Sequence, residues 1–154
     1  DNAFNWIEYN GGLCSEEDYQ YTSGTTKSAG TCLTTCENVP MSKIQSFVDV
    51  PPNSDADMMD ALSNQPVSIA IQADQKDFQL YMSGVFTGGC GTQLDHGVLT
   101  VGYGTMDGTD YYRVKNSWGE TWGDDGYIYL ARGSEFNNGA GQCGMLMQAS
   151  YPVL

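Results

Sequence analysis

The 154-residue chain has one histidine, His96. An asparagine, Asn116, follows it later in the sequence and stands directly before Ser117 and Trp118. An imidazole is a general base, and a carboxamide can hold its ring in one tautomer. Both residues also have ordinary interpretations, because a lone histidine is commonly incidental and an asparagine at a strand end commonly forms a turn. The pair is therefore a hypothesis for nucleophilic catalysis, whose thiol or hydroxyl remains to be identified.

The sequence around these two residues predicts strands. Alternating or β-branched stretches at 67–71, 97–104, 111–115 and 127–130 are typical of strands, and Asp-Gly pairs at 107–108 and 125–126 indicate turns. An antiparallel sheet or barrel would place His96 at the start of one strand and Asn116 at the end of another, both facing a cleft. Trp118 and Trp122 could shield their hydrogen bond or simply fill the core. The first turn lacks the ligands of an EF-hand, which favours a plain hairpin over a calcium loop.

The first third of the chain has a different composition. Helical spacing of apolar residues predicts a helix over residues 1–10 that ends at Asn10-Gly11-Gly12. A second helix is expected over residues 55–64, capped by Ser54 or Asp55, with Met58, Met59 and Leu62 facing inward. Residues 13–53 between them are rich in Gly, Ser, Thr, Pro and Cys, and only 44–50 resembles a strand. Cross-links are therefore expected to replace a core in this segment.

Five cysteines in a chain of this size favour an oxidising compartment on the secretory route. The odd count requires either a free thiol or a bonding partner outside the chain. Cys32 and Cys36 have the spacing of half a zinc site, but no second close pair accompanies them, so no metal is expected. No cofactor motif is present either, and a plain disulfide framework is the favoured interpretation.

The charge excludes two classes of partner. Nineteen acidic against six basic residues give a net charge of -13 and a pI near 4.1, which disfavours nucleic acid and anionic membrane surfaces. No apolar run is long enough to span a bilayer. The chain begins with Asp1 and has no leader-like segment, so we expect any targeting segment to have been removed or to lie outside this sequence.

The sequences around His96 and Asn116 resemble the papain-like cysteine peptidases of the cathepsin L type. The resemblance rests on Leu-Asp-His-Gly-Val-Leu-Thr-Val-Gly-Tyr-Gly at 94–104 and Val-Lys-Asn-Ser-Trp-Gly-Glu-Thr-Trp-Gly at 114–123. It continues through residues 11–13, 17–21, 66–71, 143–144 and 149–153, and so covers nearly the whole chain. It implies an α+β papain-like fold, with residues 1–12 ending a helical left domain and residues 13–154 forming a β-barrel right domain with crossover segments.

The resemblance also implies roles for individual residues. His96 would be the base and later the acid, and Asn116 would orient its ring. Trp118 would shield their hydrogen bond, with Trp122 near the leaving-group side. Four residues match cleft positions that hold the substrate residue before the scissile bond and its neighbour: Ala70, Leu94, Asp95 and Gly97. Gln148 matches the floor of the main specificity pocket. A polar amide at the last position argues against a simple hydrophobic preference.

In this family the nucleophilic cysteine precedes the segment that matches Asp1. The resemblance therefore implies that the upstream segment of the same enzyme is a required partner, and that these residues alone are inactive. Cys90 and Cys143 match a family disulfide, and Cys32 matches a cysteine whose partner lies upstream. Cys14 and Cys36 are left to form an additional bridge.

The resemblance implies protein or peptide substrates and control by a propeptide or cystatin-like inhibitors, in a lysosome, a vacuole or the extracellular space. Residues 13–43 contain no histidine, unlike the occluding loop of the cathepsin B type, which favours an open cleft and endopeptidase action. The alternative is a catalytically inactive homologue that acts in binding or structure, because the unseen nucleophile could be replaced. Nothing in this chain separates the two hypotheses.

Overall fold

The computed structural model describes residues 1–154, which form two compact units. The smaller unit comprises residues 1–48 and 152–154, and the larger comprises residues 49–151. Along the chain the elements are α1 (Asn2–Asn10), α2 (Ser23–Thr26), β1 (Ser46–Asp49), α3 (Asp55–Asn64), β2 (Val67–Ile71), α4 (Lys76–Gln79), β3 (Val85–Phe86), β4 (His96–Met106), β5 (Thr109–Lys115), β6 (Tyr127–Ala131), the short 3-10 helices η1 (Phe136–Gly139) and η2 (Gln142–Gly144), and β7 (Ala149–Val153). The predicted division at residue 12 stays a prediction.

One mixed sheet organises the fold, with the strand order β1-β7-β2-β4-β5-β6-β3. The predicted hairpin joins β4 to β5: Asp107 and Gly108 have φ values of 50° and 81°. A two-residue hairpin turn of type I′ requires positive φ at both central positions, which Asp-Gly supplies at little cost. The predicted α+β class is confirmed, and none of the helices combines the length and apolar character needed to cross a bilayer.

The local sequence pattern did not predict two of the strands, β3 and β7. β3 has only two residues and pairs in parallel with β6, whereas all neighbouring strands were expected to be antiparallel. A two-residue strand is too short to show alternation, so its pairing is decided by tertiary packing. β7 contains Pro152, which argues locally against a strand, yet Ala149 and Ser150 pair with β2.

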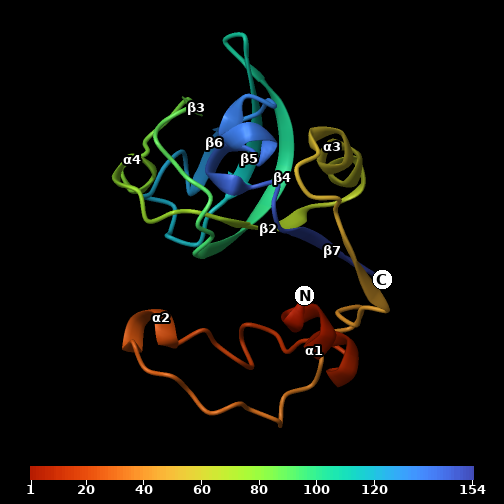
Figure 1. Ribbon diagram of the computed structural model, residues 1–154. Helices are drawn as coiled ribbons and strands as arrows, with labels where there is room; N and C mark the ends of the chain where they lie inside the picture. The colour runs from red at the N-terminus through yellow and green to blue at the C-terminus, as the bar shows by residue number, and fades with distance from the viewer. The chain divides into compact units, whose positions relative to one another are not determined.

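The core of the larger unit lies on one face of β2, β4, β5 and β6. The buried residues of these strands alternate with partly or fully exposed ones, except at the end of β6, where Leu130 and Ala131 are both buried. Helix α3 packs beside β4, as Figure 1 shows, and contributes Met58 and Ala61 to this core. The main strand residues of the core are Val67, Ile69, Ile71, Val98, Tyr112, Val114, Ile128 and Leu130.

The predicted helix over 55–64 is α3, with the predicted cap. The Ser54 hydroxyl accepts a hydrogen bond from the backbone N–H of Asp57 at 3.2 Å, which satisfies one of the free donors of the first turn. Met58 is fully buried, and Met59 and Leu62 are partly buried against the core. The predicted inward face is therefore confirmed.

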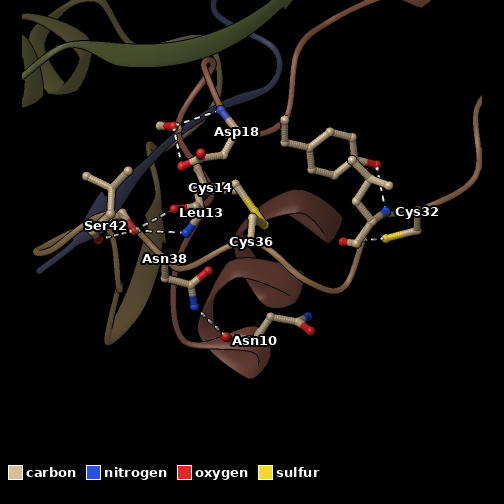
Figure 2. The surroundings of a disulfide bond; sticks show 12 residues. Asn10, Leu13, Cys14, Asp18, Cys32, Cys36, Asn38 and Ser42 are labelled. Carbon is tan, nitrogen blue, oxygen red and sulfur yellow. Dashed lines mark hydrogen bonds between the residues drawn. A yellow bond between two sulfur atoms is a disulfide. The ribbon is translucent and has the colours of Figure 1, made fainter.

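The smaller unit is held by one disulfide and by hydrogen bonds more than by a core. Helix α1 ends at Gly11, whose φ of 76° makes the predicted C-cap, but it buries none of its residues. Figure 2 shows the disulfide between Cys14 and Cys36, flanked by hydrogen bonds from Asn38 to the carbonyl of Asn10 and between Ser42 and Leu13. The expectation that cross-links replace a core between residues 13 and 53 is met in this unit.

Replacing the cap, Ser54→Ala, is expected to lower the free energy of unfolding by about 1 kcal/mol, because the Asp57 N–H loses its acceptor. Denaturant titration measures this loss. Ser63→Ala is the matched control, since Ser63 lies late in the same helix and its hydroxyl, which donates to the carbonyl of Asp60 and accepts from the side chain of Asn64, caps no backbone N–H. A change of about 0.5 kcal/mol or less is expected there. Equal losses in the two variants would show that Ser54 does not act as a cap.

Tyr81 is a buried tyrosine at the edge of the core, 6% exposed, whose hydroxyl donates to the carbonyl of Gly84 at 2.6 Å. Burial raises the pKa of Tyr81 to about 12 from its usual value of 10.0. A phenol whose pKa is raised by folding stabilises the folded state below its unfolded pKa, and this contribution disappears as pH rises through the folded pKa.

The free energy of unfolding should therefore decline between pH 10 and 12, and less steeply in Tyr81→Phe, which removes the ionisable group. Denaturant titrations at several pH values in this window measure the slope. Tyr103→Phe is the control, because Tyr103 is 44% exposed. The assignment is wrong if the slope of Tyr81→Phe equals that of the unmodified protein.

Candidate active site

The His96 and Asn116 side chains meet in the larger unit. The imidazole Nε2 of His96 lies 2.8 Å from Oδ1 of Asn116. His96 is the first residue of β4, and Asn116 directly follows β5, so the β4–β5 pairing brings residues distant in sequence together. The backbone N–H of Asn116 donates to the carbonyl of Gly126 at 3.0 Å, which holds the strand end in place.

A second hydrogen bond fixes the direction of the first. The backbone N–H of Ser117 donates to the same Oδ1 of Asn116 at 2.8 Å. Since a backbone N–H can donate only to the oxygen of a carboxamide, Oδ1 must face His96, and Nε2 must carry a proton to donate to it. The neutral ring then keeps its free lone pair on Nδ1. Asn116 is 8% exposed, and its Nδ2 is buried without a hydrogen-bond partner.

The backbone around His96 is anchored on both sides. His96 is paired with Ile71 across the β2–β4 register. The N–H of Asp95 donates to the carbonyl of Ile71 at 2.9 Å, and the Asp95 carboxylate accepts from the N–H of Ala73 at 2.8 Å. These bonds tie the turn before β4 to the end of β2, so the position of the imidazole is set by a rigid sheet.

Trp118 covers the imidazole. The two rings are stacked, with centroids 5.2 Å apart and planes inclined by 30°. Trp118 is 39% exposed, which leaves part of the indole open to solvent. Trp122 packs edge-on against Trp118 at 5.1 Å, and its Nε1–H donates to the carbonyl of Gln79 at 3.0 Å. Trp118 thus contacts the imidazole directly and Trp122 contacts Trp118, while the roles expected of both tryptophans remain proposals.

The aromatic surroundings include a residue that the sequence analysis did not single out. Phe78, in α4, is fully buried and packs edge-on against Trp118 at 5.6 Å. It also contacts Trp122 and Phe86, at 5.4 and 6.0 Å. The local sequence of α4 offers only one apolar residue, so no periodic signal marks Phe78, and its neighbours become visible only in the tertiary structure.

The five residues predicted to line the substrate cleft lie close to one another at one end of the sheet. Ala70 of β2 is paired with Gly97 of β4, and its N–H donates to the carbonyl of Gln148 at 3.0 Å. These three positions form a row across neighbouring strands, on the face opposite the core. Leu94 and Asp95 immediately precede His96. The side chains of Ala70 and Leu94 are partly exposed, and those of Asp95 and Gln148 are exposed.

The cysteines divide between the two units. Cys90 and Cys143 form a disulfide in the larger unit, and Cys14 and Cys36 form one in the smaller unit. Cys32 is a free, exposed thiol of the smaller unit. Both expected pairings are thus present in the structure, and no cysteine of the larger unit is left with a thiol.

Comparisons with known proteins agree with this geometry. The family model described as "Papain family cysteine protease" matches residues 1–153. The chain is 50% identical to the Arabidopsis thaliana protein described as "Probable cysteine protease RD21B" and covers 32% of that protein's length. It is 49% identical to vignain of Ricinus communis and covers 41% of it. In both comparisons 99% of this chain is matched, so it spans about a third to two fifths of these relatives.

Solved structures give the same result for the fold. The bromelain protease from Ananas comosus, solved in complex with the E64 inhibitor, matches with a TM-score of 0.88 and 41% identity. The match covers 99% of this chain and 67% of bromelain. The ragweed pollen allergen Amb a 11, solved in its proform, matches with a TM-score of 0.88 and 37% identity over 99% of this chain and 44% of that structure. The predicted papain-like fold is confirmed, and this chain belongs to the papain family of cysteine proteases.

Proposed function

We propose that the chain supplies the base-bearing part of a cysteine endopeptidase, with His96 as general base and acid and Asn116 as its orienting residue. The observation that carries the proposal is the 2.8 Å bond between His96 Nε2 and Asn116 Oδ1 in a chain of the papain family. Because Nε2 donates to Asn116, Nδ1 is the nitrogen available to a thiol. The stacking of Trp118 on the imidazole supports the proposal, and in it Trp118 would keep water from the hydrogen bond.

The reaction divides into two steps. In the first, Nδ1 of His96 takes the proton of a cysteine thiol, and the thiolate sulfur attacks the substrate carbonyl. The carbon–nitrogen bond breaks, and the imidazolium gives its proton to the leaving amine. In the second, His96 takes a proton from water, whose oxygen attacks the carbonyl carbon of the acyl-enzyme. The carbon–sulfur bond then breaks and releases the acid, and the imidazolium returns its proton to the cysteine sulfur. Asn116 holds the ring through both proton transfers.

The thiol is proposed to come from a segment of the same protein outside these 154 residues. Four of the five cysteines are in disulfides and therefore carry no thiol that could act as the nucleophile. Cys32, the remaining one, belongs to the other compact unit, and we propose that it pairs with a cysteine outside the chain. The greater length of the relatives is consistent with this proposal. These residues alone would then be inactive.

Substrate would bind along the row formed by Ala70, Gly97 and Gln148, beside Leu94 and Asp95. The methyl group of Ala70 and the absence of a side chain at Gly97 leave room for a substrate side chain, and the exposed Gln148 places an amide at the end of the row. Propeptide and cystatin-like inhibitors are proposed to occupy the same cleft, as proteins of this family have been solved in proform and with E64. The two disulfides favour a secretory, vacuolar, lysosomal or extracellular setting.

Labelling the whole protein with an epoxysuccinyl inhibitor of the E64 type tests this function, because the reagent alkylates a thiolate activated by an adjacent base. Peptide mapping should place the label on a cysteine other than the five of this chain, and the unlabelled protein should cleave denatured protein substrates. His96→Ala should abolish both labelling and cleavage. Absence of label and cleavage in the unmodified protein would instead establish an inactive homologue, and a label on Cys32 would overturn the assignment of the nucleophile.

Replacing the orienting residue, Asn116→Ala, should lower kcat by about a hundredfold, because the ring of His96 loses the acceptor that fixes its tautomer. KM should change little, since Asn116 is buried. Steady-state kinetics on a fluorogenic peptide gives both values. Asn64→Ala serves as control, because Asn64 is exposed in α3 and binds only within that helix. Unchanged kcat in Asn116→Ala would contradict the role given to this residue.

A further inference from the structure

We propose that a hollow in the smaller unit binds a basic side chain, Arg or Lys, of a peptide or protein partner. The hollow has a volume of about 660 Å³ and is lined by residues 17–23 and by part of the segment 30–33. This volume is typical of sites that bind small molecules and exceeds what one extended side chain requires. All of the lining residues belong to the smaller unit, which contains neither His96 nor Asn116, so the proposal does not depend on the proposed function.

Two tyrosines give the hollow aromatic walls. The ring of Tyr21 is 75% exposed, but it lies against Gly24 of α2, where an added Cβ would come within 2.8 Å of the ring. The backbone of Tyr21 is held as well, because its N–H donates to the Glu16 carboxylate at 2.9 Å. The Tyr19 hydroxyl accepts from the N–H of Leu33 at 3.4 Å and so joins the two lining segments. Aromatic rings attract guanidinium and ammonium groups through their negative faces.

The charge of the hollow also fits a cation. Glu17 and Asp18 line it and no basic residue does, since Lys27 caps α2 outside the lining. The Glu17 carboxylate has no hydrogen bond or ion pair, and the Asp18 carboxylate uses one oxygen to accept from the Ser15 hydroxyl at 2.8 Å. Residues 1–48 carry six acidic side chains and two basic ones, so the wider field of the unit attracts cations too.

A basic side chain matches the rings and the carboxylates at the same time. Its aliphatic stem can pack on the tyrosine rings while its charged head reaches the carboxylates. A metal ion would need several ligands that converge on one point, and no group of three acidic, histidine or cysteine side chains in the chain provides them. An anionic ligand would be repelled by both carboxylates.

Calorimetric titration of the whole protein with a short blocked peptide, acetyl-Gly-Arg-Gly-amide, tests the proposal at low salt. The matched ligand carries citrulline in place of arginine, which keeps the shape of the side chain and removes its charge. The arginine peptide should bind saturably, and the citrulline peptide should bind at least about tenfold more weakly. Added salt should weaken the binding of the arginine peptide, because the hollow is open to solvent.

Variants of the hollow distinguish binding there from binding at the substrate cleft. Tyr21→Leu and Glu17→Gln should each raise the Kd of the arginine peptide by about threefold to fivefold. Tyr9→Leu and Glu8→Gln are the matched controls, because both residues are exposed on α1 outside the lining, and they should change Kd by less than about twofold. Gly24→Ala should raise Kd as Tyr21→Leu does, since its Cβ would displace the Tyr21 ring without removing a lining side chain.

Absence of saturable binding, equal binding of the arginine and citrulline peptides, or equal effects of the hollow and control variants would each overturn the proposal. Failure of the proposed function is a separate outcome. It would appear as absence of peptidase activity in the unmodified protein, whereas the titration measures binding and requires no catalysis.

Discussion

The hydrogen bond between His96 Nε2 and Asn116 Oδ1 is the point on which the candidate site depends. Each partner has an ordinary structural explanation when considered alone. Together, at 2.8 Å, they determine which ring nitrogen carries the proton, because Ser117 donates to the same oxygen and so fixes the orientation of the amide. The bond also requires that the first residue of β4 and the last residue of β5 lie at the same end of this antiparallel pair. A slip of one residue in the β4–β5 register would turn one of the two side chains to the opposite face.

The sheet and the aromatic cluster contribute in different ways to this bond. The sheet sets the backbone positions, through the pairing of His96 with Ile71 and the anchoring of Asp95. The aromatic cluster determines the surroundings of the side chains. Trp118 stacks on the imidazole, and Phe78 and Trp122 pack against Trp118. Backbone hydrogen bonds are tolerant of side-chain substitution, whereas ring contacts depend on the residue present. Of these two contributions to the surroundings of the bond, the aromatic cluster therefore places the more specific requirement on the sequence.

The two compact units obtain their stability from different sources. The larger unit buries a continuous apolar face of four strands and α3. The smaller unit has few buried residues, an α1 helix with none, and a disulfide between Cys14 and Cys36. A segment that buries little apolar surface gains little from the hydrophobic effect, so a covalent constraint on its unfolded state contributes more to its stability. The strongly acidic composition is compatible with both units, since charge acts on solubility and partners more than on fold.

Local sequence was enough to determine the strands at β2, β4, β5 and β6, the capped helix α3 and the Asp107-Gly108 turn, because each carries its own periodicity or turn chemistry. The His96 and Asn116 motifs were also recognisable in the sequence, together with the family they resemble. The sequence did not determine the parallel pairing of β3 or the strand at β7, since a two-residue strand has no period and a proline disfavours a ladder. It also did not reveal Phe78. Its ring contacts with Trp118 and Trp122 join residues far apart in the chain, and such contacts exist only once the chain has folded.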